Sequence, residues 1–137
     1  MNHKSIDELK EYIEKTISVD DAILALFFAS KQEYIIKKPA LLYKIFQEIS
    51  QESKIILLND LIFDVSGPTP FCDELDQSFM RLEMSELLPY IRKGNESWYF
   101  LNDSKKYQEK SYSKFNAEEQ IDLANSAKKL IFLPKFK

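Results

Sequence analysis

The chain has 137 residues, enough for one domain, because a domain of this size buries roughly two-thirds of the surface of its unfolded chain. Hydrophobic residues make up 45% and charged residues 30% of the sequence, which excludes a disordered composition. The net charge of −3 argues against binding of nucleic acid by bulk phosphate attraction, since that mode needs clustered Lys and Arg.

Charge is unevenly distributed along the chain. Residues 55–91 contain seven acidic residues against Arg81 alone, whereas residues 105–137 contain eight lysines against four acidic residues. An acidic middle and a basic end suit either a polar partner or packing of the two parts against each other.

Compartment is indicated by the cysteine count and the apolar runs. The single cysteine, Cys72, excludes an internal disulfide, and the N-terminus lacks the apolar stretch of a secretory signal. No apolar run approaches the ~20 residues that cross a bilayer. We therefore expect a cytoplasmic protein without a membrane span.

The N-terminal third reads as helices. Patterns of Ser followed three residues later by an acid, at 5–8 and 18–21, predict two helix starts. The first helix, about 6–17, is amphipathic. The second, about 19–31, is apolar nearly all round and should be the central buried helix.

The next elements are a short strand at 34–36 and a helix at about 39–51 that begins at Pro39. Leu26 of the preceding helix and Phe46 of this one are expected in the core. Residues 55–65 are apolar but interrupted by Asn and Asp. Strand, short helix and packed loop all remain open for this segment.

A break at Gly67-Pro68 precedes a helix that we expect to be capped by Thr69, with Pro70 at its first position and Phe71 facing inward. This helix runs to about residue 84. A hairpin follows, with strands at 87–92 and 97–101 around a turn that contains Gly94. Residues 102–116 read as a solvated, mobile basic connector, and the pair Asn116 and Glu119 predicts a last helix at 117–130.

The order of helix, short strand, helix, helix and hairpin predicts an α+β, mainly helical fold of the winged helix-turn-helix type with extra N- and C-terminal helices. One domain spans 1–137, with an N-terminal helix at 1–18, a core at 19–101, and a connector and helix at 102–137. The segment between the last two helices of the core, at 54–68, exceeds the short turn of a plain helix-turn-helix.

The core also resembles a known family, over roughly residues 20–101. It is similar to the Panacea-domain antitoxins and their YwgA-like relatives, in which a helix with apolar and lysine spacing precedes a Gly-Pro segment, a helix with Leu spacing and a strand. The resemblance implies a small regulatory, antitoxin-like binding protein without catalysis. The matching residues are Ile36, Lys38, Leu41, Leu42, Ile45 and Phe46, then 62–68, then Leu75, Phe79 and Leu82, and finally Leu87 and Leu88.

Residues for catalysis or metal binding are scarce. His3 and Cys72 are the only histidine and cysteine, so no His/Cys metal cluster or Cys–His nucleophile can be assembled. Cys72 could have a lowered pKa near a helix start, but a small core residue is the simpler interpretation. The acids in the first turn of a helix stabilise its dipole. We expect no enzyme, no cofactor and no metal.

The helix at 70–84 occupies the position of a DNA recognition helix, yet it is acidic, and carboxylates repel phosphates. We therefore expect a protein-partner surface there and on the hairpin. Nucleic-acid contacts, if any, should come from the hairpin turn and the basic segment. The candidate partner surface comprises Asp73, Asp76, Glu83, Tyr90 and Trp98, and the candidate nucleic-acid contacts are Arg92, Lys93, Asn95, Lys105 and Lys106.

Two functions from different classes follow. The leading hypothesis is a non-enzymatic regulatory protein-interaction module, antitoxin-like, whose partner is a toxin or a second copy of the chain. The alternative is a DNA-binding transcriptional regulator that docks through the hairpin and the basic C-terminal segment.

Overall fold

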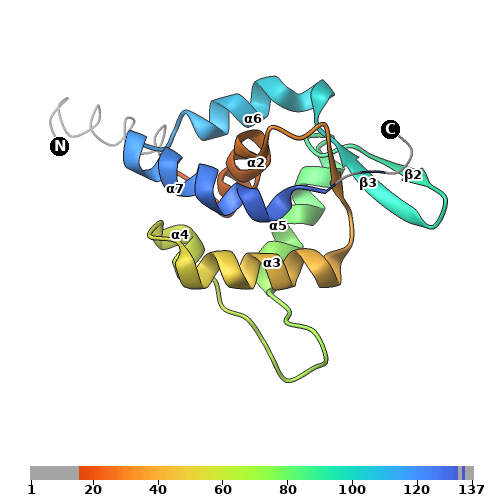
Figure 1. Cartoon of the computed structure of the whole chain (residues 1–137), viewed down its shortest axis with the longest axis horizontal. Helices are drawn as coiled ribbons and strands as arrows, with labels where there is room; N and C mark the ends of the chain where they lie inside the picture. The colour runs from red at the N-terminus through yellow and green to blue at the C-terminus, as the bar shows by residue number, and fades with distance from the viewer. Residues whose placement is uncertain (1–15, 133, 135–137) are drawn as a thin grey trace, which may run out of the picture.

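The computed structural model describes residues 16–132 and 134. These residues form an α+β, mainly helical fold of six α-helices and a three-stranded antiparallel sheet (Figure 1). The predicted helix at 6–17 falls almost entirely outside the described residues. The elements are α2 (Val19–Ser30), β1 (Tyr34–Ile36), α3 (Pro39–Glu52), α4 (Ile56–Asn59), α5 (Asp73–Met84), β2 (Tyr90–Lys93), β3 (Glu96–Phe100), α6 (Lys105–Tyr112) and α7 (Ala117–Ala127), with short 3-10 turns at Asn102–Ser104 and Lys128–Leu130.

Helix α2 is the buried centre of the molecule, as predicted. Ser18 and Asp21 form the expected capping box, because the Asp21 N–H donates to Ser18 Oγ and Ser18 N–H donates to Asp21 Oδ2. The helix packs against α5, α6 and α7 (Figure 1). Eight of its twelve residues are buried, which explains why its sequence lacks a polar face.

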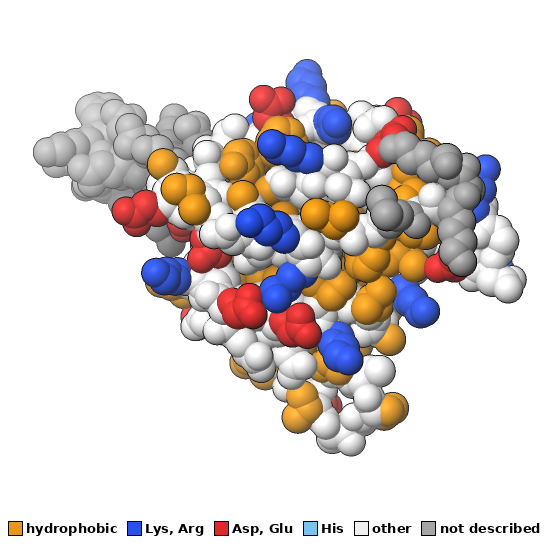
Figure 2. Space-filling view, viewed as in Figure 1, with side chains coloured by type: hydrophobic (Ala, Val, Ile, Leu, Met, Phe, Trp, Pro, Cys, Tyr) orange, Lys and Arg blue, Asp and Glu red, His pale blue; other side chains and the backbone are white. Residues whose placement is uncertain are grey.

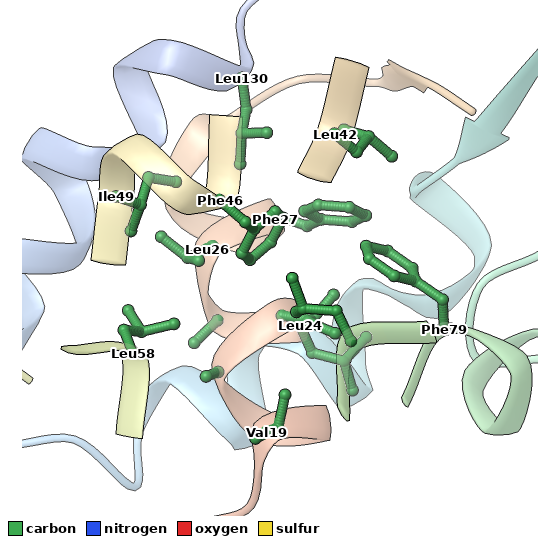
Figure 3. Close-up of a cluster of buried hydrophobic side chains, with 14 of the residues drawn as sticks. Val19, Leu24, Leu26, Phe27, Leu42, Phe46, Ile49, Leu58, Phe79 and Leu130 are labelled. Carbon is green, nitrogen blue, oxygen red and sulfur yellow. The ribbon is translucent and has the colours of Figure 1, made fainter. Parts of the chain in front are cut away.

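Helix α3 begins at Pro39, as predicted, and buries an apolar stripe. Figure 3 shows Phe46 of this helix beside Phe27 of α2 and Phe79 of α5. The Phe46 and Phe79 rings meet edge to face with centroids 6.0 Å apart, and Phe27 lies 6.2 Å from Phe79. Leu26 and Phe46 are both fully buried, so their prediction as core residues is confirmed.

The segment left open at 55–65 is a short helix followed by a loop. Helix α4 ends at Asn59, and the chain then extends below α3 (Figure 1). Asp64 and Phe71 exchange two backbone hydrogen bonds of 2.7 and 2.9 Å, which close the loop. Its apolar side chains Ile62 and Val65 are exposed, 81% and 64% respectively.

The start of α5 was predicted too early. Thr69 does not cap the helix and Pro70 is not its first residue, because the bridge between Asp64 and Phe71 holds the backbone extended up to Cys72. Helix α5 therefore begins at Asp73. Phe71 is not inward-facing as predicted: it is 43% exposed, with its ring against Tyr43 at 5.5 Å.

The sheet has the order β1-β3-β2, and both pairings are antiparallel. The predicted hairpin is confirmed, with Gly94 in the left-handed conformation that its turn requires. Its first strand begins at Tyr90 rather than Leu87. The N–H groups of Leu87 and Leu88 both donate to the Leu82 carbonyl, so these residues close the end of α5 instead.

Residues 102–116 are not a mobile connector. They contain α6, which packs on α2, with the Tyr112 and Phe28 rings 5.1 Å apart. The side chains that α6 buries are polar, Gln108 and Ser111, and therefore leave little hydrophobic signal in the sequence. Ser111 Oγ donates to Asp21 Oδ1 at 2.8 Å, and Lys114 Nζ lies 3.1 Å from Asp21 Oδ2.

The C-terminal helix is close to its prediction. Asn116 and Glu119 form the expected capping box of α7, and a 3-10 turn extends the helix to Leu130. Asp122 accepts hydrogen bonds from Ser53 Oγ at 2.7 Å and from the Lys54 N–H at 3.0 Å, so α7 fixes the end of α3. In the described part of the chain, no helix is both long and apolar enough to cross a membrane.

Candidate protein-interaction surface

On the solvent-facing side of helix α5, four residues form what we call the outward stripe: Asp73, Gln77, Met80 and Met84. These residues recur every three or four positions and are all exposed, Met80 by 54% and Met84 by 80%. Glu74 and Arg81 are exposed beside it. The opposite face carries Leu75, Phe79 and Leu82, whose burial against α2 and α3 fixes the rotation of the helix. The outward stripe therefore combines a carboxylate, an amide and two flexible thioethers.

The only basic residue of α5 is held by a neighbouring helix. Arg81 Nη2 and Nε donate to the two carboxylate oxygens of Asp20 at 2.8 and 3.2 Å. Burial raises the pKa of Asp20, but hydrogen bonds from Arg81 and Ser78 outweigh it and hold that pKa below its ordinary value. The same contact raises the pKa of the Arg81 guanidinium. This cation is committed to a fork-shaped ion pair with α2.

Beside the outward stripe lies a cavity of about 220 Å³ between α3, α5 and the sheet, which we call the tyrosine cleft. Tyr99 Oη donates to Glu83 Oε2 at 2.7 Å, and Lys37 Nζ lies 3.1 Å from Glu83 Oε1. Tyr43 Oη donates to Asp76 Oδ1 at 3.0 Å. The lining residues are Lys37, Pro39, Leu42, Tyr43, Asp76, Phe79, Met80, Glu83 and Tyr99.

Both tyrosines of the cleft stay protonated at neutral pH. Burial and the adjacent carboxylates, Asp76 for Tyr43 and Glu83 for Tyr99, raise the pKa of each phenol far above its ordinary value. Each hydroxyl therefore remains a hydrogen-bond donor to its carboxylate, and each carboxylate keeps a fixed position in the wall of the cleft.

The predicted partner-surface residues are only partly brought together. Asp76 and Glu83 line the tyrosine cleft, and Tyr90 lies at its edge with Lys37 Nζ 3.7 Å from its ring centroid. Asp73 belongs to the outward stripe and contacts Gln77 at 3.0 Å. Trp98 is only 5% exposed and pairs with Ile36 and Ile91 in the sheet.

The predicted nucleic-acid contacts lie in two separate places. Arg92, Lys93 and Asn95 are exposed at the tip of the hairpin, where Arg92 Nε donates to the Gly94 carbonyl at 3.2 Å. Lys105 and Lys106 are exposed in the first turn of α6, beyond the far end of β3 (Figure 1). The length of the hairpin separates the two groups.

The face seen in Figure 2 shows Lys and Arg interspersed with Asp and Glu rather than gathered into one block. Lys129 forms two ion pairs with α3, because its Nζ lies 3.7 Å from Glu48 Oε2 and 3.3 Å from Glu52 Oε2. The basic end of the chain thus pairs partly with acids of α3. Orange side chains also reach the surface at the lower end of the view, where the loop below α3 lies.

Cys72 is 1% exposed, and burial raises the pKa of its thiol, so it is a core residue rather than a reactive nucleophile. Among the residues that the structure describes, no group of three or more His, Cys, Asp or Glu side chains could hold a metal ion.

Two polar residues of the cleft were not identified from the sequence: Lys37 and Tyr43. Tyr43 lies 33 positions from the carboxylate it contacts and Tyr99 lies 16 positions from its own. The one available signal was the placement of two tyrosines on apolar faces, at α3 and β3, where a buried hydroxyl requires a partner.

Comparisons with known proteins identify no relative. No protein-family model, curated protein or solved structure matches the chain. The resemblance to the Panacea-domain antitoxins therefore stays a prediction. Functional inference depends on the residues of the outward stripe and the tyrosine cleft.

Proposed function

We propose that the protein is a non-enzymatic regulatory module that uses a winged helix-turn-helix arrangement to bind another protein. The arrangement is supported by the order α2, β1, α3, α5 and the β2–β3 hairpin, together with the sheet order β1-β3-β2. In this arrangement α5 takes the position of the recognition helix, and the hairpin takes the position of the wing.

One observation carries the choice of a protein partner: the outward stripe offers no cation. Asp73, Met80 and Met84 are exposed, and the one arginine of α5, whose side chain is 57% exposed beside the stripe, has its guanidinium paired with Asp20. A DNA-reading helix needs cations or amides toward phosphates and base edges, and only Gln77 fits that requirement. Exposed methionines, in contrast, adapt well to an apolar protein surface.

The module acts by occupying its partner, as an antitoxin does, and the partner is a toxin or a second copy of the chain. The acidic side chains of α5 steer and orient that partner, since rim charges chiefly set association rate and orientation. The exposed apolar loop below α3 adjoins the start of α5, because Asp64 of the loop is bridged to Phe71, two residues before that helix. It extends the proposed surface.

The test is capture of a partner from the native host, followed by binding of the purified pair. The triple variant Asp73→Lys, Gln77→Lys and Met84→Lys changes only the outward stripe and should abolish binding. A matched control places the same charge change on exposed positions of α7: Glu118→Lys, Ile121→Lys and Ala124→Lys. Each set raises the net charge by four, two from the replaced acid and one from each of the other positions. Equal loss in both sets would refute the proposed surface.

A DNA-binding regulator is the second candidate, favoured by the exposed Arg92, Lys93 and Asn95 at the hairpin tip. For this function, the triple stripe variant should strengthen binding, while Arg92→Ala with Lys93→Ala should weaken it for all sequences. A gel-shift titration separates the two. Sequence-specific affinity near ~10 nM at physiological salt would establish DNA binding.

A further inference from the structure

The tyrosine cleft carries one uncompensated negative charge. Glu83 is held by two donors, Tyr99 Oη at 2.7 Å and Lys37 Nζ at 3.1 Å, and its charge is offset by that ammonium. Asp76 accepts one hydrogen bond from the described residues, from the neutral hydroxyl of Tyr43. With one cation and two carboxylates, the lining has a net charge of −1 that is centred on Asp76.

Apolar and aromatic groups surround that carboxylate. Leu42 and Phe79 line the cleft as buried side chains, whereas Pro39 and Met80 line it as exposed ones. Such walls lower the local dielectric, so a charge entering the cleft interacts with Asp76 more strongly than it would in water. The tyrosine rings add faces that attract cations.

An anion does not fit this cleft. The ammonium of Lys37 is already engaged by Glu83 and by the Tyr90 ring at 3.7 Å, and the remaining charge is negative. The volume of about 220 Å³ is also below the ~300 Å³ at which small-molecule sites usually begin. One side chain suits this volume better than a whole ligand.

We propose that the tyrosine cleft receives a basic side chain, arginine or lysine, from the protein partner. The cationic head pairs with Asp76, and the apolar stem lies along Met80 and Pro39. The assignment rests on the proposed function and adds the chemistry that the partner must present. An apolar segment with a projecting basic side chain matches the cleft and the outward stripe together.

The test uses methyl NMR on the whole chain and needs no partner. Its two reporters are Met80, which lines the cleft, and Met84, which lies on the same helix outside it. The probe is N-acetyl-arginine methylamide, titrated to about 50 mM, since one charged contact supports a Kd of about 1–10 mM. We expect the Met80 methyl signal to shift with saturation while the Met84 signal stays in place.

Whether binding depends on charge is tested by changing first the probe and then the protein. The citrulline analogue of the probe, which has the same shape without the charge, should fail to saturate. The Asp76→Asn variant keeps an acceptor for Tyr43 and should bind the arginine probe about tenfold more weakly, because bonds to charged groups are the stronger ones. Asp73→Asn, one turn earlier on α5 and outside the cleft, should bind like the unmodified protein.

Several outcomes overturn the proposal. They are an unmoved Met80 signal, equal shifts of Met80 and Met84, equal binding of the citrulline analogue, or no effect of Asp76→Asn in a variant whose thermal unfolding is unchanged. Agmatine, a free small molecule with the same guanidinium group, provides one further test. If it binds about 100-fold more tightly than the capped arginine, the cleft is a site for a free small cation and not for a side chain of the partner. Failure of partner capture with a positive titration would reject the proposed function and leave the cation site standing.

Discussion

Helix α2 is covered in two different ways. Toward α3 and α5 it buries Phe27, whose ring centroid lies 6.2 Å from that of Phe79, and Phe79 in turn lies 6.0 Å from Phe46. Toward α6 its contacts include a polar cluster, in which Asp21 holds Ser111 and Lys114. Burial of apolar surface is insensitive to charge state, whereas ion pairs and hydrogen bonds respond to pH and salt. Substitutions on the two sides of α2 should therefore differ in how much they destabilise the fold and in how that loss depends on pH and salt.

The largest effect is expected on the aromatic side. Phe46→Ala should lower the free energy of unfolding by about 3–5 kcal/mol, because it removes a fully buried ring and leaves a cavity against Phe79. Phe46→Leu, which keeps most of the volume, is the control and should lose much less. Denaturant unfolding measures both. A loss below ~1 kcal/mol in the alanine variant would mean that this side is not the main core.

A smaller effect is expected on the polar side. Asp21→Ala removes an N-terminal capping contact of α2 and both contacts to the α6 end, and should cost about 1–2 kcal/mol. Asp21→Asn retains an acceptor oxygen and loses only the charge, so it should cost less. Hydrogen exchange of α6 amides should rise in the alanine variant. Unchanged exchange there would show that α6 is held by its ring contact at Tyr112 instead.

The smallest effect on stability is expected at the ion pair between Asp20 and Arg81, and it depends on pH. Because the folded pKa of Asp20 lies below its unfolded value of ~3.9, the ionised carboxylate adds stability above that pH, and this contribution is lost as pH falls through the folded pKa. Asp20→Asn should therefore be less stable than the unmodified protein near neutral pH. The two proteins should converge as the pH falls below the folded pKa of Asp20. Parallel stability curves across that range would exclude a role for the pair with Arg81.

The sequence correctly predicted those features of the fold that depend on residues close together in the chain. The capping boxes of α2 and α7, Pro39 at the start of α3 and Gly94 in the hairpin turn all lie where the sequence predicted them. The start of α5 was wrong because a bridge to Asp64 overrides the capping preference of Thr69. Long-range contacts, rather than propensity, decided that boundary.

The candidate surface was harder to predict, for a similar reason. Acidic residues of α5 could be identified by composition, but the partners of Asp76 and Glu83 come from α3 and the sheet. Asp76 and Glu83 therefore serve as walls of a cleft as well as surface charges. Helix α6 escaped prediction because its buried residues, Gln108 and Ser111, are polar.

Among the strands that the structure describes, the sheet order β1-β3-β2 places β2 at an outer edge of the sheet. Such an edge can template the addition of a strand from another molecule and so begin aggregation. Arg92 and Lys93 are exposed on β2, and the positive charges of two approaching copies would oppose that pairing. We therefore expect the basic end of the hairpin to oppose edge-to-edge pairing of two copies at high concentration.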